Sequence, residues 1–271
     1  MPTELAVILP VYQGDHPGHF TEALDSVLCQ LPAGALLIVV ADGPLTAELE
    51  EVMPLESSAA EVLRLPENRG LAAALNAGIE LALSRSYTLI ARMDADDRML
   101  PGRLEAQRAF LQNHPDIDIV GTAIVEIDWE GNARGKTVVY PGSHDACLEF
   151  FRFRDPVAHP AVMFRSSFFE KAGLYDPQYR KNQDTELWFR GFVHGCRFAN
   201  LSLPGLEFRM SDEFFRLRRG GWRRGRELIA LRKRINRELG FGWKARLFTC
   251  AVFILTVMPA GLRKLAYRIF R

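Results

Sequence analysis

The first hundred residues of the chain alternate between short apolar runs and segments of helical character. The runs cover Leu5–Leu9, Ala35–Ala41, Glu61–Leu65 and Tyr87–Met93. This alternation is typical of parallel sheets, because a helix is needed to carry the chain back before the next parallel strand begins. The sequence therefore predicts an α/β fold with a parallel sheet between two layers of helices.

Helices are expected between these runs, and further elements follow them. The bounds come from apolar spacing, from turn residues and from a Pro at one helix start. Helices are expected at about 19–30, 46–53, 71–84, 101–113, 144–151 and 184–194. Ile117–Asp128 and Lys136–Tyr140 predict a hairpin or meander, and His159–Phe164 predicts a strand that returns to the sheet.

The fourth apolar run ends in three closely spaced acids, Asp94, Asp96 and Asp97. Clustered carboxylates raise one another's pKa, so such a cluster is costly unless a positive group lies beside it. Hard cations such as Mg²⁺ take carboxylate and phosphate oxygens, and ligands of α/β folds bind at the ends of strands. The residues alone leave two interpretations open, a cation site and a solvated acidic turn.

Charge is distributed unevenly along the chain, although its formal net charge is only +1. Residues 213–271 carry 16 Lys and Arg against three Asp and Glu, whereas residues 1–212 carry 18 against 30. An acidic body with a basic tail indicates that the tail meets an anionic surface, which is either a membrane or a nucleic acid. We place the domain boundary at this change, with residues 213–271 as a basic helical extension.

The extension contains a basic helical stretch, Phe214–Leu239, and an apolar run, Leu247–Leu262. The apolar run is shorter than the roughly 20 residues that span a bilayer. Basic flanks and nearby aromatic residues favour a helix that lies at the membrane interface. The alternative is a helix that packs against the body of the protein.

The N-terminal sequence and the cysteines indicate the cellular compartment in which the chain is expected. The N-terminus leads directly into a strand, so no signal peptide is expected. The four cysteines show no CxxC spacing, which indicates neither a zinc site nor a disulfide framework. We expect reduced thiols in the cytoplasm.

Five motifs occur in an order that resembles one enzyme family. They are Leu9–Tyr12, Ala41–Gly43, Asn68–Gly70 with Asn76–Gly78, Met93–Asp97, and Gln183–Asp184 followed by Leu187–Trp188. Together they resemble the family 2 glycosyltransferases, over roughly residues 4–210. The chain is similar to the bacterial members that build exopolysaccharide or O-antigen, including the amylovoran type. The resemblance implies a GT-A fold, which is a Rossmann-like mixed sheet flanked by helices.

The resemblance also implies a donor site for a nucleotide-sugar, most simply a UDP-sugar. Pro10, Val11 and Tyr12 would flank the nucleobase, and Asp42 would accept the N3–H of uracil. Asn68 and Gly70 would contact the nucleotide. Taken without the family, the same residues are ordinary turn and cap residues.

Asp94-Ala95-Asp96 matches the DxD element of the family. The resemblance implies that Asp94 contacts the ribose or the metal and that Asp96 coordinates a Mg²⁺ or Mn²⁺ ion that bridges the donor diphosphate. Such an ion neutralises charge on the departing nucleotide. Asp97 is expected to support the loop.

Asp184 matches the general base of the family, which takes the proton of the acceptor hydroxyl. The start of the predicted helix would favour its ionised form. The alternative is a helix cap without a catalytic role. Gln183 stands where the family usually carries Glu, which leaves the supporting carboxylate open; Glu186 is one possibility, on a different helix face.

Candidate acceptor contacts follow from position alone. His159 either lines the acceptor site or is structural, and Trp188 either stacks on an acceptor sugar or packs in the core. Three arginines of the last third, Arg209, Arg216 and Arg218, either reach phosphates or belong to the basic tail.

These observations predict an inverting, metal-dependent glycosyltransferase at the cytoplasmic face of a bacterial plasma membrane. Its acceptor would be a saccharide or an undecaprenyl-diphosphate-linked saccharide, the tail would bind the anionic membrane surface, and no nucleic acid is expected. One rival is transfer of a sugar to polyprenyl phosphate. The other is a non-catalytic, membrane-tethered nucleotide-binding protein.

Overall fold

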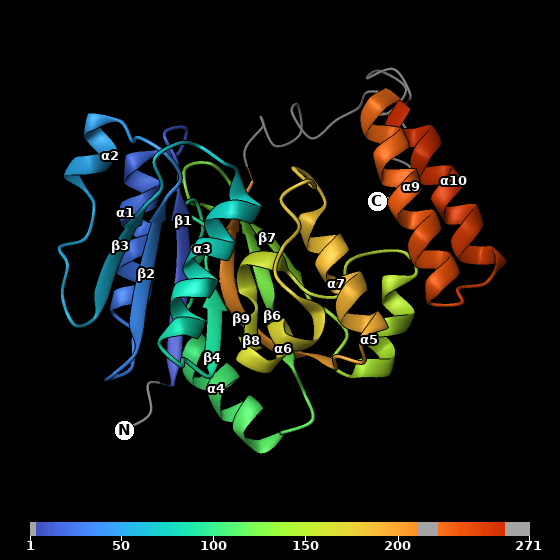
Figure 1. Cartoon of the computed structure of the whole chain (residues 1–271), viewed down its shortest axis with the longest axis horizontal. Coiled ribbons are helices and arrows are strands. Elements are labelled where there is room, and N and C mark those ends of the chain that lie inside the picture. Colours follow the sequence, from blue (N-terminus) through green and yellow to red (C-terminus); the bar gives the residue numbers. More distant parts are fainter. Residues whose placement is uncertain (1–3, 211–221, 258–271) are drawn as a thin grey trace.

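The computed structural model describes residues 4–210 and 222–257 of the chain. These residues form a mixed sheet with helices on both faces (Figure 1). The strands are β1 (Leu5–Val11), β2 (Leu36–Ala41), β3 (Ala60–Arg64), β4 (Leu89–Arg92), β5 (Arg98–Met99), β6 (Ile119–Ile127), β7 (Ala133–Val138), β8 (Met163–Arg165) and β9 (Phe198–Arg209).

Helices connect most of these strands. They are α1 (Pro17–Leu28), α2 (Ala47–Glu51), α3 (Leu71–Ser84), α4 (Arg103–Asn113), α5 (His144–Phe151), α6 (Ser166–Ala172), α7 (Gln183–Val193), α9 (Trp222–Glu238) and α10 (Trp243–Val257), with a 3₁₀ turn, η1, at His159–Ala161. The helices expected from the sequence are confirmed to within a few residues at each end.

One half of the sheet is parallel, as the sequence predicts. The strand order is β3-β2-β1-β4-β8-β6-β9-β5, and the first four strands of this order run parallel to one another. Because β1 and β4 are neighbours, the segments that follow them lie at the same edge of the sheet. The sequence motifs at Leu9–Tyr12 and Met93–Asp97 are thus brought together by the topology.

The other half of the sheet is mixed. β8 runs antiparallel to both β4 and β6, and β9 runs parallel to β6. The predicted hairpin is confirmed as β6 and β7. The expected strand at His159–Phe164 is only partly correct, because it begins at Met163 and His159 lies in the 3₁₀ turn. Pro160 explains the difference, since it has no N–H to donate to a strand ladder.

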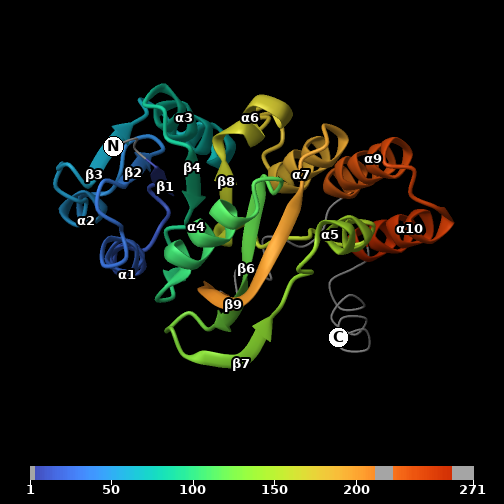
Figure 2. The ribbon, with the colours of Figure 1, turned by 90° about the horizontal axis from the view of Figure 1, so that it is seen from below.

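Alternate residues of the strands enter two separate hydrophobic cores. In β1, Ala6 and Ile8 pack into the core beneath α3, α6 and α7, whereas Val7 and Leu9 pack into the core beneath α1 and α4. Figure 2 shows these two groups of helices on opposite faces of the sheet. The result is the three-layer α/β arrangement expected from the sequence.

Helix α3 lies unusually close to the sheet. A Cβ added at Gly78 would lie 2.6 Å from the Ile8 Cγ2 atom and 3.1 Å from the Val40 Cγ2 atom. Only a glycine allows this approach without displacing the strands. The middle of α3 is thereby packed closely against β1 and β2.

Helices α9 and α10 form a hairpin beside α5 and α7 (Figure 1). Leu231 and Ile235 of α9 belong to the same core as α7, and Asn236 donates a hydrogen bond to the Thr249 hydroxyl of α10 at 3.0 Å. The described part of the basic extension therefore packs on the body of the protein. Among the described residues, no helix combines the length and the apolar character needed to cross a membrane.

Candidate active site

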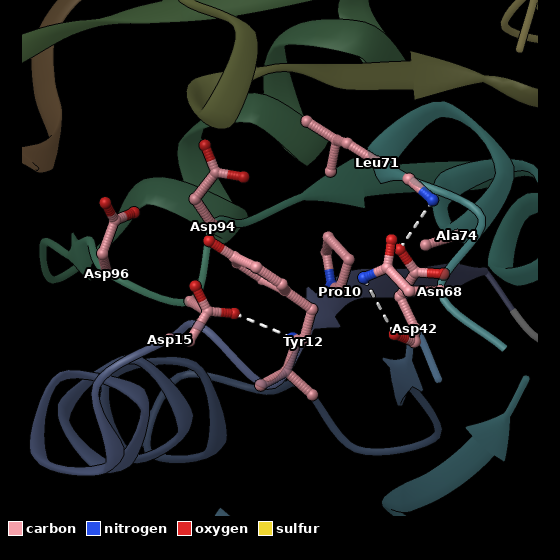
Figure 3. Close-up of a pocket in the computed structure, with 12 residues that line it drawn as sticks. Pro10, Tyr12, Asp15, Asp42, Asn68, Leu71, Ala74, Asp94 and Asp96 are labelled. Carbon is pink, nitrogen blue, oxygen red and sulfur yellow. Dashed lines mark hydrogen bonds between the residues drawn. The ribbon is translucent and has the colours of Figure 1, made fainter. Parts of the chain in front are cut away.

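A pocket of about 390 Å³ opens at the ends of β1, β2 and β4 (Figure 3). It contains every residue that the sequence assigns to the donor site. Its lining is Pro10, Val11, Tyr12, Asp15, Asp42, Asn68, Gly70, Leu71, Ala74, Asp94, Ala95 and Asp96. Asp15, Leu71 and Ala74 are the members that the sequence analysis did not identify.

Asp42 closes one end of the pocket. Its carboxylate accepts hydrogen bonds from the backbone N–H groups of Arg69 at 2.7 Å and Gly70 at 2.8 Å, and its carbonyl accepts one from the Asn68 side chain at 3.2 Å. Gly70 has φ +89°, a conformation that favours glycine, at the start of α3. The loop before α3 is therefore held in place by the residue at the end of β2.

Tyr12 and Asp15 form one wall of the pocket between its two ends (Figure 3). The backbone N–H of Tyr12 donates to the Asp15 carboxylate at 2.9 Å, and the Tyr12 side chain stays largely exposed. Burial, with smaller contributions from the charges of Asp96 and Asp94, raises the pKa of Asp15 to about 7. Asp15 thus belongs to the same electrostatic cluster as the strand-end acids.

The acids that follow β4 lie at the other end of the pocket. One carboxylate oxygen from each of Asp94, Asp96 and Asp97 lies within 4.8 Å of the others. Asp96 is exposed at the mouth of the pocket, but nearby protein atoms displace much of its hydration. This loss of hydration and the charge of Asp94 raise the pKa of Asp96 to about 6.

Buried arginines hold the acidic loop in position. Arg92 Nη2 lies 2.6 Å from the Asp94 carboxylate, and the Arg92 side chain is only 3% exposed. Arg103, which is fully buried, donates to the Arg92 carbonyl at 2.8 Å. The sequence analysis did not assign Arg92 a role. Its place within the fourth apolar run was the signal, because a buried arginine requires a partner.

Asp97 faces away from the mouth of the pocket. It is 1% exposed, and its carboxylate accepts the backbone N–H of Arg209 at 2.9 Å. Burial, followed by the charges of Asp96 and Asp94, raises the pKa of Asp97 well above its usual value. This contact ties the acidic loop to the end of β9, as expected of a residue that supports the loop.

The sequence left two interpretations of Arg209 open, a phosphate contact and a part of the basic tail, and the structure supports neither, because Arg209 is the last residue of β9 and is buried. Its side chain is 1% exposed, and it donates to the Asp96 carbonyl at 2.8 Å, the Trp129 carbonyl at 2.7 Å and the Glu22 carboxylate at 2.5 Å. These contacts occupy the guanidinium of Arg209, which thereby anchors the acidic loop. Arg216 and Arg218 lie outside the described residues.

The chemistry of the acidic cluster fits a divalent cation. Burial, followed by the charges of the neighbouring acids, raises the pKa values of Asp96 and Asp97, and Asp97 Oδ2 is buried without a hydrogen-bond partner. Within the described part of the chain, no basic side chain forms an ion pair with Asp96. Carboxylate oxygens are the ligands that Mg²⁺ and Mn²⁺ prefer.

Asp184 lies on the first turn of α7, outside the lining of the pocket. One of its oxygens lies 4.0 Å from His159 Nδ1, and the other accepts the backbone N–H of Thr185 at 2.8 Å. His159 Nε2 lies 2.8 Å from the Tyr175 hydroxyl. The expected base therefore belongs to a second group of polar residues.

Tyr175 connects the two groups. Burial raises its pKa, Arg92 lowers it, and both Asp184 and Asp94 raise it, so its hydroxyl lies within the electrostatic reach of both carboxylates. Asn76 of α3 holds the backbone of Tyr175 by two hydrogen bonds, at 2.8 and 2.9 Å. The helix that begins at the pocket thus also positions the loop beside Asp184.

Of the two interpretations of Trp188, the structure supports packing in the core rather than stacking on an acceptor sugar, because this side chain is fully buried. Its ring packs near Phe164, Phe198 and His159. Helical spacing alone does not distinguish a residue that packs in the core from one that faces a ligand. In the structure Trp188 lies in the core. His159 remains beside Asp184, with its side chain 10% exposed.

Glu186 does not act as a supporting carboxylate for Asp184. It is 2% exposed, and both of its oxygens accept hydrogen bonds from Arg190, which also donates to the carbonyls of Ala172 and Leu174. The carboxylate that does lie near Asp184 is Asp155, whose pKa burial and the charge of Asp184 raise to about 6. No motif in the sequence marks Asp155.

Comparison with known proteins adds family evidence to this geometry. The family model described as Glycosyl transferase family 2 matches residues 6–170. The chain is 30% identical over 217 residues to the amylovoran biosynthesis glycosyltransferase AmsE of Erwinia amylovora, a match that covers 79% of each chain. It is 29% identical over 220 residues to an Escherichia coli UDP-Gal:alpha-D-GlcNAc-diphosphoundecaprenol beta-1,3-galactosyltransferase, covering 80% of this chain and 78% of that one.

Solved structures agree on the fold. The S. aureus TarS 1-349 structure in complex with UDP superposes with a TM-score of 0.66 at 16% sequence identity, covering 91% of this chain and 69% of that one. The complex of the same protein with UDP-GlcNAc gives a TM-score of 0.64 at 15% identity, covering 94% and 82%. The mixed sheet and its flanking helices are those of a GT-A fold. This chain belongs to glycosyl transferase family 2.

Proposed function

We propose that this chain is an inverting glycosyltransferase that moves a sugar from a UDP-sugar to a lipid-linked saccharide in bacterial surface polysaccharide biosynthesis. One observation carries the proposal: a single pocket contains Asp42 at one end and Asp94 and Asp96 at the other. A nucleoside diphosphate has a matching arrangement, with a hydrogen-bonding base at one end and a diphosphate at the other.

The Asp42 end fits the uracil base. Each oxygen of the Asp42 carboxylate already accepts one backbone N–H, which fixes its orientation. A carboxylate oxygen has a second lone pair, so Asp42 can still accept the N3–H of uracil. Pro10 and the exposed Tyr12 side chain would flank the base, and Asn68 would support this end of the pocket.

The Asp94 and Asp96 end fits the diphosphate together with a divalent ion. Asp96, with Asp94 beside it, would hold Mg²⁺ or Mn²⁺, and such an ion supplies neutralisation of the charge on the leaving UDP. Arg92 keeps Asp94 oriented through their 2.6 Å contact, and Asp97 keeps the loop attached to β9.

Asp184 is the proposed general base. It would accept the proton of the acceptor hydroxyl while that oxygen attacks C1 of the donor sugar, and the bond between C1 and the phosphate oxygen would break with its electrons leaving on UDP. His159, 4.0 Å from Asp184, and Tyr175, which contacts His159, would line the acceptor side.

The relatives support the donor and acceptor classes. TarS has been solved with UDP and with UDP-GlcNAc, and the E. coli relative is named for transfer from UDP-Gal to a diphosphoundecaprenol-linked sugar. The E. coli relative matches over four-fifths of this chain, a span that includes most of the body. We infer the same donor class and a lipid-linked acceptor here.

The outer face of α10 supports binding to an anionic membrane. Trp243, Leu247 and Ile254 are 67%, 60% and 53% exposed, and their spacing places them on one side of the helix; we call them the α10 stripe. Lys244 and Arg246 are exposed on the same helix. An apolar stripe beside basic residues is the pattern of a helix that lies in the headgroup region. We propose on this ground that the enzyme binds the cytoplasmic face of the plasma membrane through α10.

A donor screen tests the proposal. Release of UDP is measured from UDP-galactose and UDP-GlcNAc, with and without undecaprenyl-diphosphate-GlcNAc, and with undecaprenyl phosphate as a separate acceptor. Release that requires the diphosphate-linked saccharide supports the proposal. Release that requires undecaprenyl phosphate would instead support the rival polyprenyl-phosphate transferase. Tight UDP binding without any turnover would support the non-catalytic alternative.

A further inference from the structure

Thr185 connects Asp184 to a second carboxylate, Asp155, in the loop after α5. The Thr185 hydroxyl donates to Asp155 Oδ2 at 2.9 Å, and the Thr185 backbone N–H donates to Asp184 Oδ1 at 2.8 Å. One residue therefore orients both carboxylates. The Asp155 side chain is 33% exposed as a whole, but its Oδ1 atom is inaccessible to solvent and accepts no hydrogen bond.

The positive charge that faces Asp155 comes from the C-terminal hairpin. Arg232 of α9 places Nη2 3.9 Å from Asp155 Oδ1, and its side chain is only 10% exposed. Its Nη1 donates to the Phe151 carbonyl at 2.9 Å, and its guanidinium lies over the Phe151 ring, 5.5 Å from the centroid. The hydrogen bond and the ring contact fix the guanidinium beside the carboxylate.

The charges of the three groups are linked. Burial and then the charge of Asp184 raise the pKa of Asp155, whereas Arg232 and the Thr185 hydroxyl lower it. Burial lowers the pKa of Arg232, and both Asp155 and Asp184 raise it. Among the described residues, the charge of Asp155 also raises the pKa of Tyr140, which Glu126 raises and Arg154 lowers, and His159 and Tyr175 lie on the side of Asp184.

A purely structural ion pair explains this arrangement less well. Helix α9 is already attached to the body by Leu231 and Ile235 in the core, and by Arg234 over the Phe189 ring at 4.9 Å. Apolar side chains can replace a buried ion pair without loss of stability, so attachment alone does not require a buried arginine. The guanidinium of Arg232 instead balances the negative charge of Asp155. Thr185 donates a hydrogen bond both to this carboxylate and to the proposed base, Asp184.

We propose that Asp155 and Arg232 are positioning residues for Asp184, acting through Thr185, and that the C-terminal hairpin thereby completes the acceptor side of the site. This inference rests on the proposed role of Asp184 as the base. The ionised form of Asp155 accepts the Thr185 hydroxyl, and Thr185 holds Asp184 with the other oxygen toward His159. Arg232 keeps Asp155 ionised near neutral pH.

The first test measures the pKa of Asp155 in the full chain, by NMR of ¹³Cγ-labelled aspartate, and needs no turnover. Arg232→Gln should raise the pKa of Asp155 above about 6, and Asp184→Asn should lower it. Arg237→Gln removes a positive charge from the exposed side of the same helix, where the side chain is 78% exposed, and should leave it unchanged. Equal shifts in Arg232→Gln and Arg237→Gln would overturn the proposed link.

The second test measures turnover of UDP-galactose or UDP-GlcNAc with undecaprenyl-diphosphate-GlcNAc against pH. Thr185→Val and Asp155→Asn should lower kcat by about 10- to 100-fold, in the range expected when a reacting group is slightly misplaced, with the KM for donor unchanged. Thr185→Ser keeps the hydroxyl and should restore kcat. Arg232→Gln should move the acid limb of the kcat profile to higher pH, and Arg232→Lys should move it back.

Two results of this second test would also overturn the inference. One is an unchanged acid limb in Arg232→Gln, and the other is a Thr185→Ser variant as slow as Thr185→Val, which would indicate a packing effect. UDP affinity, measured for every variant, shows whether the donor half is folded. A wild-type chain that releases no UDP would count against the proposed function, whereas the NMR shifts would still decide whether the charges are linked.

Discussion

The Asp42 carboxylate accepts the backbone N–H of Gly70 at 2.8 Å, although the two residues lie 28 positions apart in the chain. With the matching bond from Arg69, this contact joins the end of β2 to the start of α3. The same helix holds Tyr175 through Asn76, on the side of Asp184. The pocket and the loop beside Asp184 are therefore both attached to α3, so the proposed donor and acceptor halves share one rigid element.

Asp42→Asn should weaken UDP binding. An amide has one oxygen instead of two, so it loses one backbone hydrogen bond and directs an NH₂ group at an N–H donor. The loss of such a bond costs about 1 to 2 kcal/mol, which corresponds to a Kd for UDP about tenfold higher. Calorimetry measures it, with Asp25→Asn on the exposed side of α1 as the control. Equal affinities for Asp42→Asn and wild type would contradict the base-end assignment.

Gly43→Ala should lower both stability and UDP affinity. Gly43 has φ +87°, and an added Cβ would lie 2.6 Å from the backbone nitrogen of Asn68 in the pocket wall. Gly34→Ala is the matched control, because Gly34 has φ +82° but no atom within 4 Å of its added Cβ. Both substitutions should lower the Tm through backbone strain, of about 1 to 2 kcal/mol. Only Gly43→Ala should raise the Kd for UDP; an equal effect of both would show that Asn68 is not held by this contact.

Removal of divalent metal should stop sugar transfer. Treatment with EDTA should abolish UDP release, and added Mg²⁺ or Mn²⁺ should restore it. Mn²⁺ at a hundredfold excess over its Kd should stabilise the wild-type chain by about 2.7 kcal/mol. Asp96→Asn should lose most of this thermal shift, whereas Asp116→Asn, an exposed acid paired with Arg197, should keep it. Activity that is insensitive to EDTA would rule out the metal role of Asp96.

Leu247→Glu should weaken binding to vesicles that contain phosphatidylglycerol. Leu247 lies at the centre of the α10 stripe and is 60% exposed. Burial of a leucine side chain contributes about 1.5 to 3 kcal/mol, so its loss should reduce partitioning by about tenfold or more. Leu203→Glu changes a leucine that is 41% exposed on β9 and should have no effect. If both variants sediment with vesicles like the wild type, the α10 stripe is not the membrane face.

The sequence predicts the parallel half of the sheet well, because apolar runs and helical spacing alternate there. Strand β9 was not predicted, since Ser202, Pro204 and Gly205 interrupt its apolar pattern. Its register shifts against β6 occur at this interruption. Packing against β6, which no local pattern encodes, decides its structure.

Nine of the twelve residues that line the pocket were identified from the sequence, because they follow strands and occur in an ordered set of motifs. The contacts that support Asp184 were not predicted. Asp155 and Arg232 lie 77 positions apart, on elements that meet only through tertiary packing. Trp188 shows the opposite limit, since helical spacing gives a core residue and a ligand-facing residue the same pattern.

The most direct test of the account compares Asp184→Asn with the wild-type chain in two assays. Asp184 lies outside the lining of the donor pocket, so the variant should bind UDP with wild-type affinity. The amide cannot accept a proton, so UDP release in the presence of donor and acceptor should fall by about 100-fold or more. Retained UDP binding with lost transfer is the predicted result. Unchanged transfer by Asp184→Asn would contradict the assignment of the base and, with it, the proposed two-part site.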